Sequence, residues 1–173
     1  MASRRSLKDI ERLYRKGLDD GVAEVAEAFL DEATRIIEEE AVDQGTLKNS
    51  SETRKPEPLV RVVAWTANHA AFVHYGTRPH WPPLEPIKAW VRRNLARVTT
   101  TAGKNVDVIR PEGRMAERAR RSPDKVIEQV ARSIQAKIAK EGTAPVPWVP
   151  RALSRVKPKQ ASILSDAIKR RLQ

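Results

Sequence analysis

Residues 71–83 have the sequence AFVHYGTRPHWPP and lead directly into LEPIKAWVRRNL at residues 84–95. The first stretch gathers aromatic side chains, breaks at Gly76 and ends in a turn that contains tryptophan and two prolines. The fixed φ of proline suits the first turn of a helix, and the next residues repeat apolar side chains at helical spacing. The sequence therefore predicts one helical turn over 70–75, a rigid connection and an amphipathic helix over 84–97.

Upstream, residues 6–40 carry apolar side chains at steps of three and four, which predicts one long helix or two helices end to end. Ser6, three positions before Asp9, is a suitable helix N-cap. Gly17 and Gly21 interrupt the pattern, and each costs a helix interior about 1 kcal/mol relative to alanine. Such glycines mark either a kink or a close approach to another backbone. We expect them to kink or break the helix.

A β-hairpin is predicted after this helix. Gly45 is expected to end the helix, and the polar residues 46–55 form the first strand. The second strand, over 59–67, is rich in valine and bounded by turn residues. Pro56 and Pro58 favour a loop rather than a two-residue turn between the strands.

The C-terminal part alternates between irregular and helical patterns. Residues 98–122 lack a clear period and predict a long loop or mobile insertion. A helix is expected over 124–140, with Gly142 as its cap. Residues 144–150, APVPWVP, contain too much proline for a helix or a central strand. A last amphipathic helix is expected over 159–172.

These elements predict a single α+β domain over residues 1–173, in which a long N-terminal amphipathic helix packs on a small antiparallel sheet with additional C-terminal helices. The chain has no cysteine, which excludes disulfides, thiolate metal sites and cysteine nucleophiles. No apolar run reaches the roughly 20 residues that span a bilayer. The basic N-terminus is not followed by an apolar segment, so we expect a soluble protein made in a cytoplasm.

The net charge of +11 is unevenly distributed. Residues 1–100 hold 16 Lys and Arg against 15 Asp and Glu, whereas residues 101–173 hold 17 against 7, a net +10. This asymmetry favours a polyanionic partner, nucleic acid first and an acidic protein surface second, over a protein that is merely soluble and rich in arginine. For the basic clusters themselves, a solvated charged face is an equal alternative. The concentrated basic side chains, which would contact DNA phosphates, are Arg114, Arg118, Arg120, Arg121, Lys169, Arg170 and Arg171.

Three histidines lie close together in the sequence, His69, His74 and His80, and suggest a nuclease with a general acid and a general base. No Asp, Glu or Cys occurs in residues 60–83, so neither a metal site nor an acidic partner for an imidazole is at hand. Packing or surface positions are therefore the default interpretation of these histidines.

The four tryptophans divide into two pairs. Trp90 lies on an apolar helix stripe and Trp65 in the predicted strand, so both are expected in the core. Trp81 and Trp148 are each flanked by prolines. A rigid aromatic side chain loses little entropy on binding, which makes this pair candidates for a docking surface. The alternative is that they clamp the chain on itself.

The order of these motifs resembles that of the tail-component, or neck and tail-completion, proteins of long-tailed bacteriophages (siphophage and myophage type). The resemblance rests on Tyr75-Gly76-Thr77-Arg78-Pro79 and on Pro147-Trp148-Val149-Pro150-Arg151-Ala152-Leu153, in order with the long helix and the valine-rich strand. It covers most of the chain apart from about residues 98–122. In that family an acidic residue is usual where this chain has His74, and a phenylalanine-based motif stands in place of Trp148-Val149.

The resemblance implies a structural virion protein and not an enzyme, with no catalytic site, cofactor or metal. It implies a homo-oligomeric ring, a hexamer or alternatively a dodecamer, that joins head and tail in the phage neck after assembly in the host cytoplasm. Its partners would be the connector or stopper, the tail terminator, the tail tube and genomic DNA, with no membrane. The alternatives are a non-specific nucleic-acid-binding protein and, third, a histidine-dependent nuclease. Interface candidates are Tyr75, Gly76, Thr77, Arg78, Pro79, Trp81, Trp148, Pro150 and Arg151.

Overall fold

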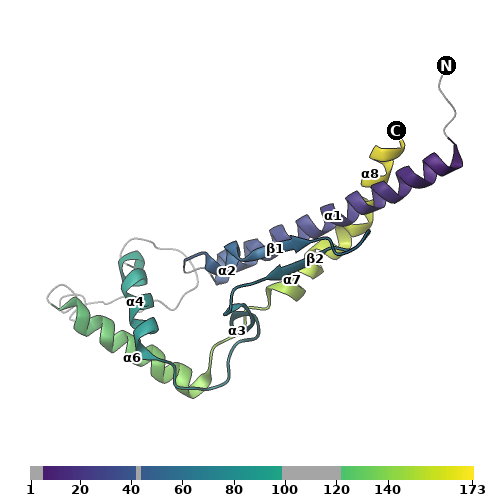
Figure 1. The fold of residues 1–173 in the computed structure, drawn as a ribbon. Coiled ribbons are helices and arrows are strands. Elements are labelled where there is room, and N and C mark those ends of the chain that lie inside the picture. The colour runs from purple at the N-terminus through teal and green to yellow at the C-terminus, as the bar shows by residue number, and fades with distance from the viewer. Residues whose placement is uncertain (1–5, 42–43, 99–121) are drawn as a thin grey trace. The chain divides into compact units, whose positions relative to one another are not determined.

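The computed structural model describes residues 6–41, 44–98 and 122–173 (Figure 1). Contacts divide the chain into two compact units. Unit 1 comprises Met1–His74 and Val146–Gln173, and unit 2 comprises Tyr75–Pro145. Each unit has its own cluster of buried apolar side chains. The α+β class is confirmed: helices dominate, and the sheet has two antiparallel strands.

Helix α1, Leu7–Glu40, is one continuous helix of 34 residues. Its N-cap is the predicted one, because the Ser6 side chain accepts a hydrogen bond from the amide of Asp9 at 3.2 Å. The expected kink at Gly17 and Gly21 is wrong. Both glycines are buried inside the helix. A Cβ on Gly17 would lie 2.7 Å from Ile168 Cα, so the glycines provide space for a second helix.

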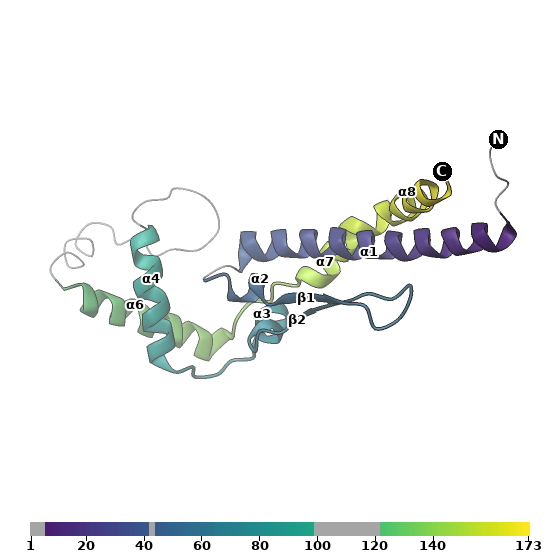
Figure 2. The same ribbon diagram turned by 45° about the horizontal axis from the view of Figure 1, so that its top comes forward.

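That second helix is α8, Gln160–Leu172, which matches the predicted C-terminal helix. It lies along the N-terminal half of α1 in both views (Figures 1 and 2). It follows a short helix that the sequence did not predict, α7, Trp148–Val156, and the 3-10 turn η1, Lys157–Lys159. Proline does not prevent α7, because Pro150 lies in its first turn, where the amide has no helical partner to lose.

The predicted hairpin is confirmed, but its strands are shorter. Strand β1, Ser51–Arg54, pairs antiparallel with β2, Val62–Trp65, and Ser51 lies opposite Trp65. Residues 46–49 of the expected first strand instead form helix α2, Thr46–Asn49. Gly45 does not end α1. It has φ 77° and caps the start of α2, whereas α1 ends at Glu40.

The core of unit 1 joins the elements that lie far apart in the sequence. Its buried members are Ala33, Ile36, Ile37, Leu47, Ala70, Trp148 and Ala152. Trp65 of β2 links the sheet to helices α1 and α7. Its ring lies edge-on to Phe29 of α1, with 6.3 Å between the ring centroids, and edge-on to Trp148 of α7, with 5.7 Å between them. The long helix therefore packs on the small sheet, as the sequence predicted.

Helix α3, Ala70–Tyr75, has the predicted bounds and ends at Gly76. Unit 2 then contains α4, Leu84–Val98, and α6, Pro123–Glu141, which agree with the predicted helices. Their contact buries Val91, Val126, Ile127, Val130 and Ala131. The expected loop over 98–122 falls almost wholly outside the described residues.

Candidate interaction surfaces

The segment 75–81 is held by a backbone clamp inside unit 2. Thr77 and Thr143 form an antiparallel bridge, with each amide donating to the other's carbonyl at 3.2 Å and the two hydroxyls 3.0 Å apart. Gly76 has φ 72° and Gly142 has φ 76°, a region that glycine adopts without strain. A Cβ on Gly142 would lie 2.0 Å from the Thr77 carbonyl oxygen. The clamp therefore requires glycine in both of its segments, at Gly76 and at Gly142.

The clamp presents aromatic side chains to solvent. Tyr75 is 77% exposed and Trp81 is 69% exposed. Arg78 and Pro79 between them are also exposed. Exposed aromatic side chains on a fixed backbone are typical of binding surfaces, because little conformational freedom remains to be lost on association. The structure thus places this part of the predicted interface at the surface.

Trp148 is not at the surface, so of its two interpretations the intramolecular one applies. Its side chain is 2% exposed and meets the His74 ring edge-on at 4.5 Å. Trp148 begins α7 and its ring packs against those of Trp65 on β2 and His74 on α3, whereas Pro150 two residues later is exposed. Val149 and Leu153 on α7 are exposed, so these apolar side chains were missed as surface candidates.

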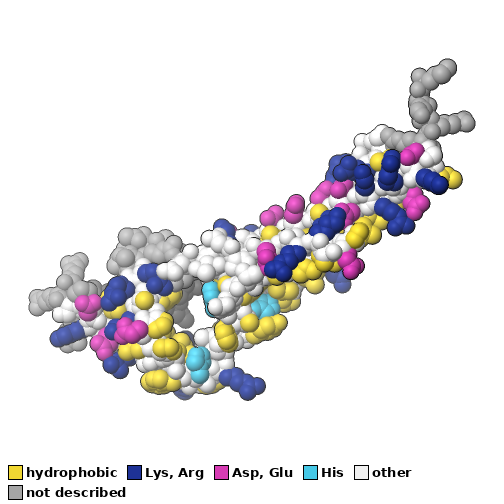
Figure 3. Space-filling model, in the orientation of Figure 1, with side chains coloured by type: hydrophobic (Ala, Val, Ile, Leu, Met, Phe, Trp, Pro, Cys, Tyr) yellow, Lys and Arg dark blue, Asp and Glu magenta, His cyan; other side chains and the backbone are white. Residues whose placement is uncertain are grey.

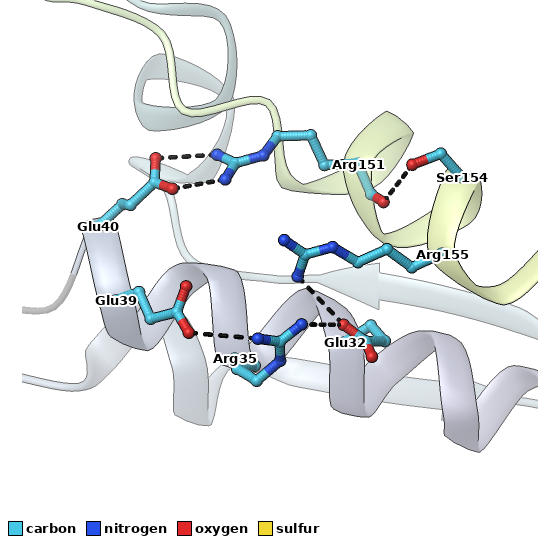
Figure 4. Close-up of polar contacts among 7 residues, drawn as sticks. All are labelled: Glu32, Arg35, Glu39, Glu40, Arg151, Ser154 and Arg155. Atoms are coloured by element: carbon cyan, nitrogen blue, oxygen red, sulfur yellow. Dashed lines mark hydrogen bonds and ion pairs between the residues drawn. The ribbon is translucent and has the colours of Figure 1, made fainter.

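Arg151 belongs to a network of ion pairs between α1 and α7 (Figure 4). Its guanidinium donates two hydrogen bonds to Glu40, at 2.6 and 2.8 Å. These bonds lower the pKa of the Glu40 carboxyl and raise the pKa of Arg151. Arg155 and Arg35 share Glu32, at 3.2 and 2.6 Å. The network fixes α7 on the C-terminal end of α1, so Arg151 has a structural partner within the chain.

The C-terminal basic side chains also have partners. Lys169 lies 3.6 Å from Asp166 on its own helix, and Arg171 lies 2.6 Å from Asp20 on α1. Arg170 pairs with Glu24, also on α1. These pairs align α8 with α1, which the sequence reasoning did not foresee. The other basic candidates, Arg114, Arg118, Arg120 and Arg121, lie outside the described residues.

The three histidines have different surroundings, each within its own unit. His74 is buried beside Trp148, and burial lowers its pKa. His69 is exposed in unit 1, whereas the His80 ring in unit 2 contacts its neighbour's backbone, with Nδ1 2.9 Å from the Arg78 carbonyl oxygen. Among the described residues, no three His, Cys, Asp or Glu side chains are arranged to hold a metal ion. The histidines therefore occupy packing and surface positions.

Asp19 of α1 is a centre of hydrogen bonds that sequence reasoning missed. It accepts hydrogen bonds from the Arg61 guanidinium at 3.0 Å, from Lys55 and from the Leu59 amide at 3.0 Å. The Arg61 side chain is only 10% exposed. Leu59 has φ 63°, an uncommon conformation for a residue with a side chain, and the bond from its amide to Asp19 helps to hold it there. Asp19 therefore fixes the β1–β2 connection on α1.

Replacing Asp19 by asparagine should lower the midpoint of thermal unfolding at pH 7. Hydrogen bonds from Arg61, Lys55 and Leu59 hold the pKa of the Asp19 carboxyl far below its usual value. A carboxyl whose folded pKa is depressed stabilises the fold above its unfolded pKa of about 4, and this contribution is lost as the pH falls further. The difference between wild type and Asp19→Asn should therefore shrink below pH 4.

Asp31→Asn is the matched control, since Asp31 lies exposed on the same helix. It should leave the midpoint of thermal unfolding unchanged both at pH 7 and below pH 4. A pH-independent difference between Asp19→Asn and wild type would contradict the assigned ion pairs. Amide hydrogen exchange at residues 59–61 should accelerate only in Asp19→Asn.

The first turns of α1 carry exposed apolar side chains. Leu7, Ile10 and Tyr14 are all exposed there. Leu172, the last residue of α8, is exposed as well. Periodicity alone cannot show where the covering helix ends.

Within the described ranges, none of the helices combines the length and apolar character that crossing a membrane requires.

Comparisons with known protein families, with curated protein sequences and with solved structures found no match to this chain.

Proposed function

We propose that this chain is a structural protein of a long-tailed phage neck, which joins head and tail as a homo-oligomeric ring around the DNA channel. The observation that carries the proposal is the clamped segment at Tyr75–Pro79, one of the two motifs on which the resemblance rests. Its backbone is fixed by two glycines and the Thr77–Thr143 bridge, while Tyr75 and Trp81 remain exposed. A fixed backbone with exposed aromatic side chains is suited to subunit contacts.

Several further features agree with a binding role rather than a catalytic one. The histidines occupy packing and surface positions, as described above. Exposed apolar side chains lie on both α3 and α7, and a closed ring needs two different patches per subunit. The partners in this proposal are further copies of the chain, the neighbouring neck and tail proteins, and the genomic DNA.

The double variant Tyr75→Ala/Trp81→Ala should weaken self-association by at least about 30-fold, because truncating an aromatic anchor at an interface costs about 2 kcal/mol or more. The measurement is the oligomeric state as a function of concentration, by size-exclusion chromatography with light scattering and by electron microscopy. Tyr14→Ala, which removes an exposed aromatic side chain from α1, is the control and should assemble like wild type.

Function is tested by adding the purified protein to extracts of a phage that lacks this gene. Wild type and Tyr14→Ala should restore the joining of heads to tails, and Tyr75→Ala/Trp81→Ala should not. Normal virions in the absence of the protein would exclude the proposal. A protein that stays monomeric yet binds nucleic acid with a steep salt dependence would favour the alternative, a non-specific nucleic-acid-binding protein.

A further inference from the structure

An open groove of about 630 Å³ lies in unit 1 beside the N-terminal turns of α1. Its other walls are the connection between β1 and β2 and the end of α8. Six basic side chains line it: Lys8, Arg12, Arg15, Lys16, Lys55 and Arg171. Figure 3 shows Lys and Arg side chains, in dark blue, gathered over the end of unit 1 where α1 begins. Three carboxylates, Glu11, Asp19 and Asp20, line the groove as well, so basic side chains outnumber acidic ones by three.

Helix geometry arranges four of these cations in a row. Lys8, Arg12 and Arg15 are spaced by four and three residues and so share one face of α1, with Lys16 at its edge. At 1.5 Å per residue the row is about 12 Å long. Each strand of a DNA duplex carries one phosphate charge per about 3.4 Å of the duplex axis, so about three to four phosphates of one strand pass along such a row.

Two of the carboxylates in the groove, Asp19 and Asp20, pair with Lys55 and Arg171. The ion pairs along α1, in contrast, do not remove its four cations from use. Arg15 pairs with Glu11 at 3.0 Å and Arg12 with Asp9 at 3.0 Å, but the two arginine side chains stay 71% and 67% exposed. Exposed ion pairs are worth little and exchange readily for other anions. Lys8 and Lys16 have no ion pair within the described part of the chain, so they can bind phosphate without breaking one.

We propose that this groove binds the phosphate backbone of duplex DNA. The inference rests on the proposed function for the choice of DNA, and it locates the DNA contact on the first turns of α1 rather than on the paired cations of α8. Its contacts are to phosphates alone, so binding is independent of base sequence and weakens with salt. Arginine forks match phosphate oxygens in pairs, which suits Arg12 and Arg15 to this role.

The test is binding of a fluorescent 20-base-pair duplex by anisotropy across a range of salt concentrations. The triple variant Lys8→Gln/Arg12→Gln/Lys16→Gln should lose at least about 10-fold in affinity at low salt, and the slope of log K against log salt should fall by about 2 to 3. The control Lys125→Gln/Lys137→Gln/Lys140→Gln removes the same charge from exposed positions on α6. It should change affinity less than about 2-fold. Equal losses in the two variants would overturn the proposal.

A second pair of variants tests the groove in the opposite direction. Glu11→Gln frees Arg15 and should raise DNA affinity about 2- to 3-fold. Glu128→Gln removes the same kind of pair on α6, where Arg132 lies 2.7 Å from Glu128, and should leave affinity unchanged. Tighter binding of fluorescent polyglutamate than of the duplex would identify an acidic protein as the ligand and overturn the proposal.

The two proposals fail separately. Oligomeric state is measured on every variant, and loss of DNA binding with intact self-association supports the groove. If the groove variants form rings and bind DNA as tightly as wild type does, this inference is refuted and the proposal of a ring stands. A monomer with groove-dependent DNA binding would refute the ring and retain the groove.

Discussion

Gly142→Ala should destabilise unit 2 by about 2–6 kcal/mol. Gly142 has φ 76° and ψ −159°, a region open essentially to glycine alone, and strain there costs about 1–3 kcal/mol. The new Cβ would also lie 2.0 Å from the Thr77 carbonyl oxygen, so the clamp must open, and overpacking of this kind costs about another 1–3 kcal/mol. Urea denaturation followed by tryptophan fluorescence measures the loss. Hydrogen exchange of α4 and α6 assigns it to unit 2.

Gly45→Ala is the control for this prediction. Gly45 has a similar φ of 77°, but a Cβ there would come no closer than 3.6 Å to a neighbouring atom. Gly45→Ala should lower the free energy of unfolding by about 1–2 kcal/mol, which is the strain of the left-handed conformation alone. Equal destabilisation by the two variants would show that the clamp contributes nothing beyond backbone strain.

Gly17→Leu should separate α8 from α1 and lower stability by about 3 kcal/mol. The Cβ of any side chain at Gly17 would lie 2.7 Å from the backbone of Ile168, which a rotamer change cannot relieve. Moving the helices apart exposes part of Leu164 and Ile168, at a cost of about 1.5–3 kcal/mol, and forcing a larger side chain into a close-packed contact costs about another 1–3 kcal/mol. The better helix propensity of leucine returns about 1 kcal/mol.

Gly17→Leu is measured by thermal unfolding, followed by circular dichroism, and by amide hydrogen exchange in α8. The exchange rate in α8 should increase in proportion to the fall in the equilibrium constant for folding. Glu27→Leu adds the same side chain at an exposed position of α1 and should not destabilise. A stable Gly17→Leu variant with a protected α8 would mean that the two helices do not depend on this close contact.

Local signals in the sequence were sufficient for most elements. The Ser6 cap and the turn at Gly76 follow from short-range chemistry, and the structure confirms both. The glycines of α1 could not be interpreted in this way. A kink and a close helix contact leave the same pattern in one sequence, and only the position of α8 distinguishes them.

The candidate surfaces divide along the same line. Trp81 was a candidate for a docking surface because prolines flank it, and Tyr75 was an interface candidate through the family resemblance; both are exposed. Trp148 has similar flanking residues but is buried, because burial depends on which element packs above it. Asp19 binds groups 36 to 42 residues away, and no local pattern marks such a partner.

Unit 2 is an insertion between the two segments of the chain that form unit 1. The amide of Val146 donates to the Val73 carbonyl at 2.9 Å, so the chain leaves unit 1 and re-enters it at one point. Insertions are tolerated where both ends lie together, because the host fold pays little to accommodate them. A change in the length of unit 2 should therefore leave the packing of the long helix and its partners intact.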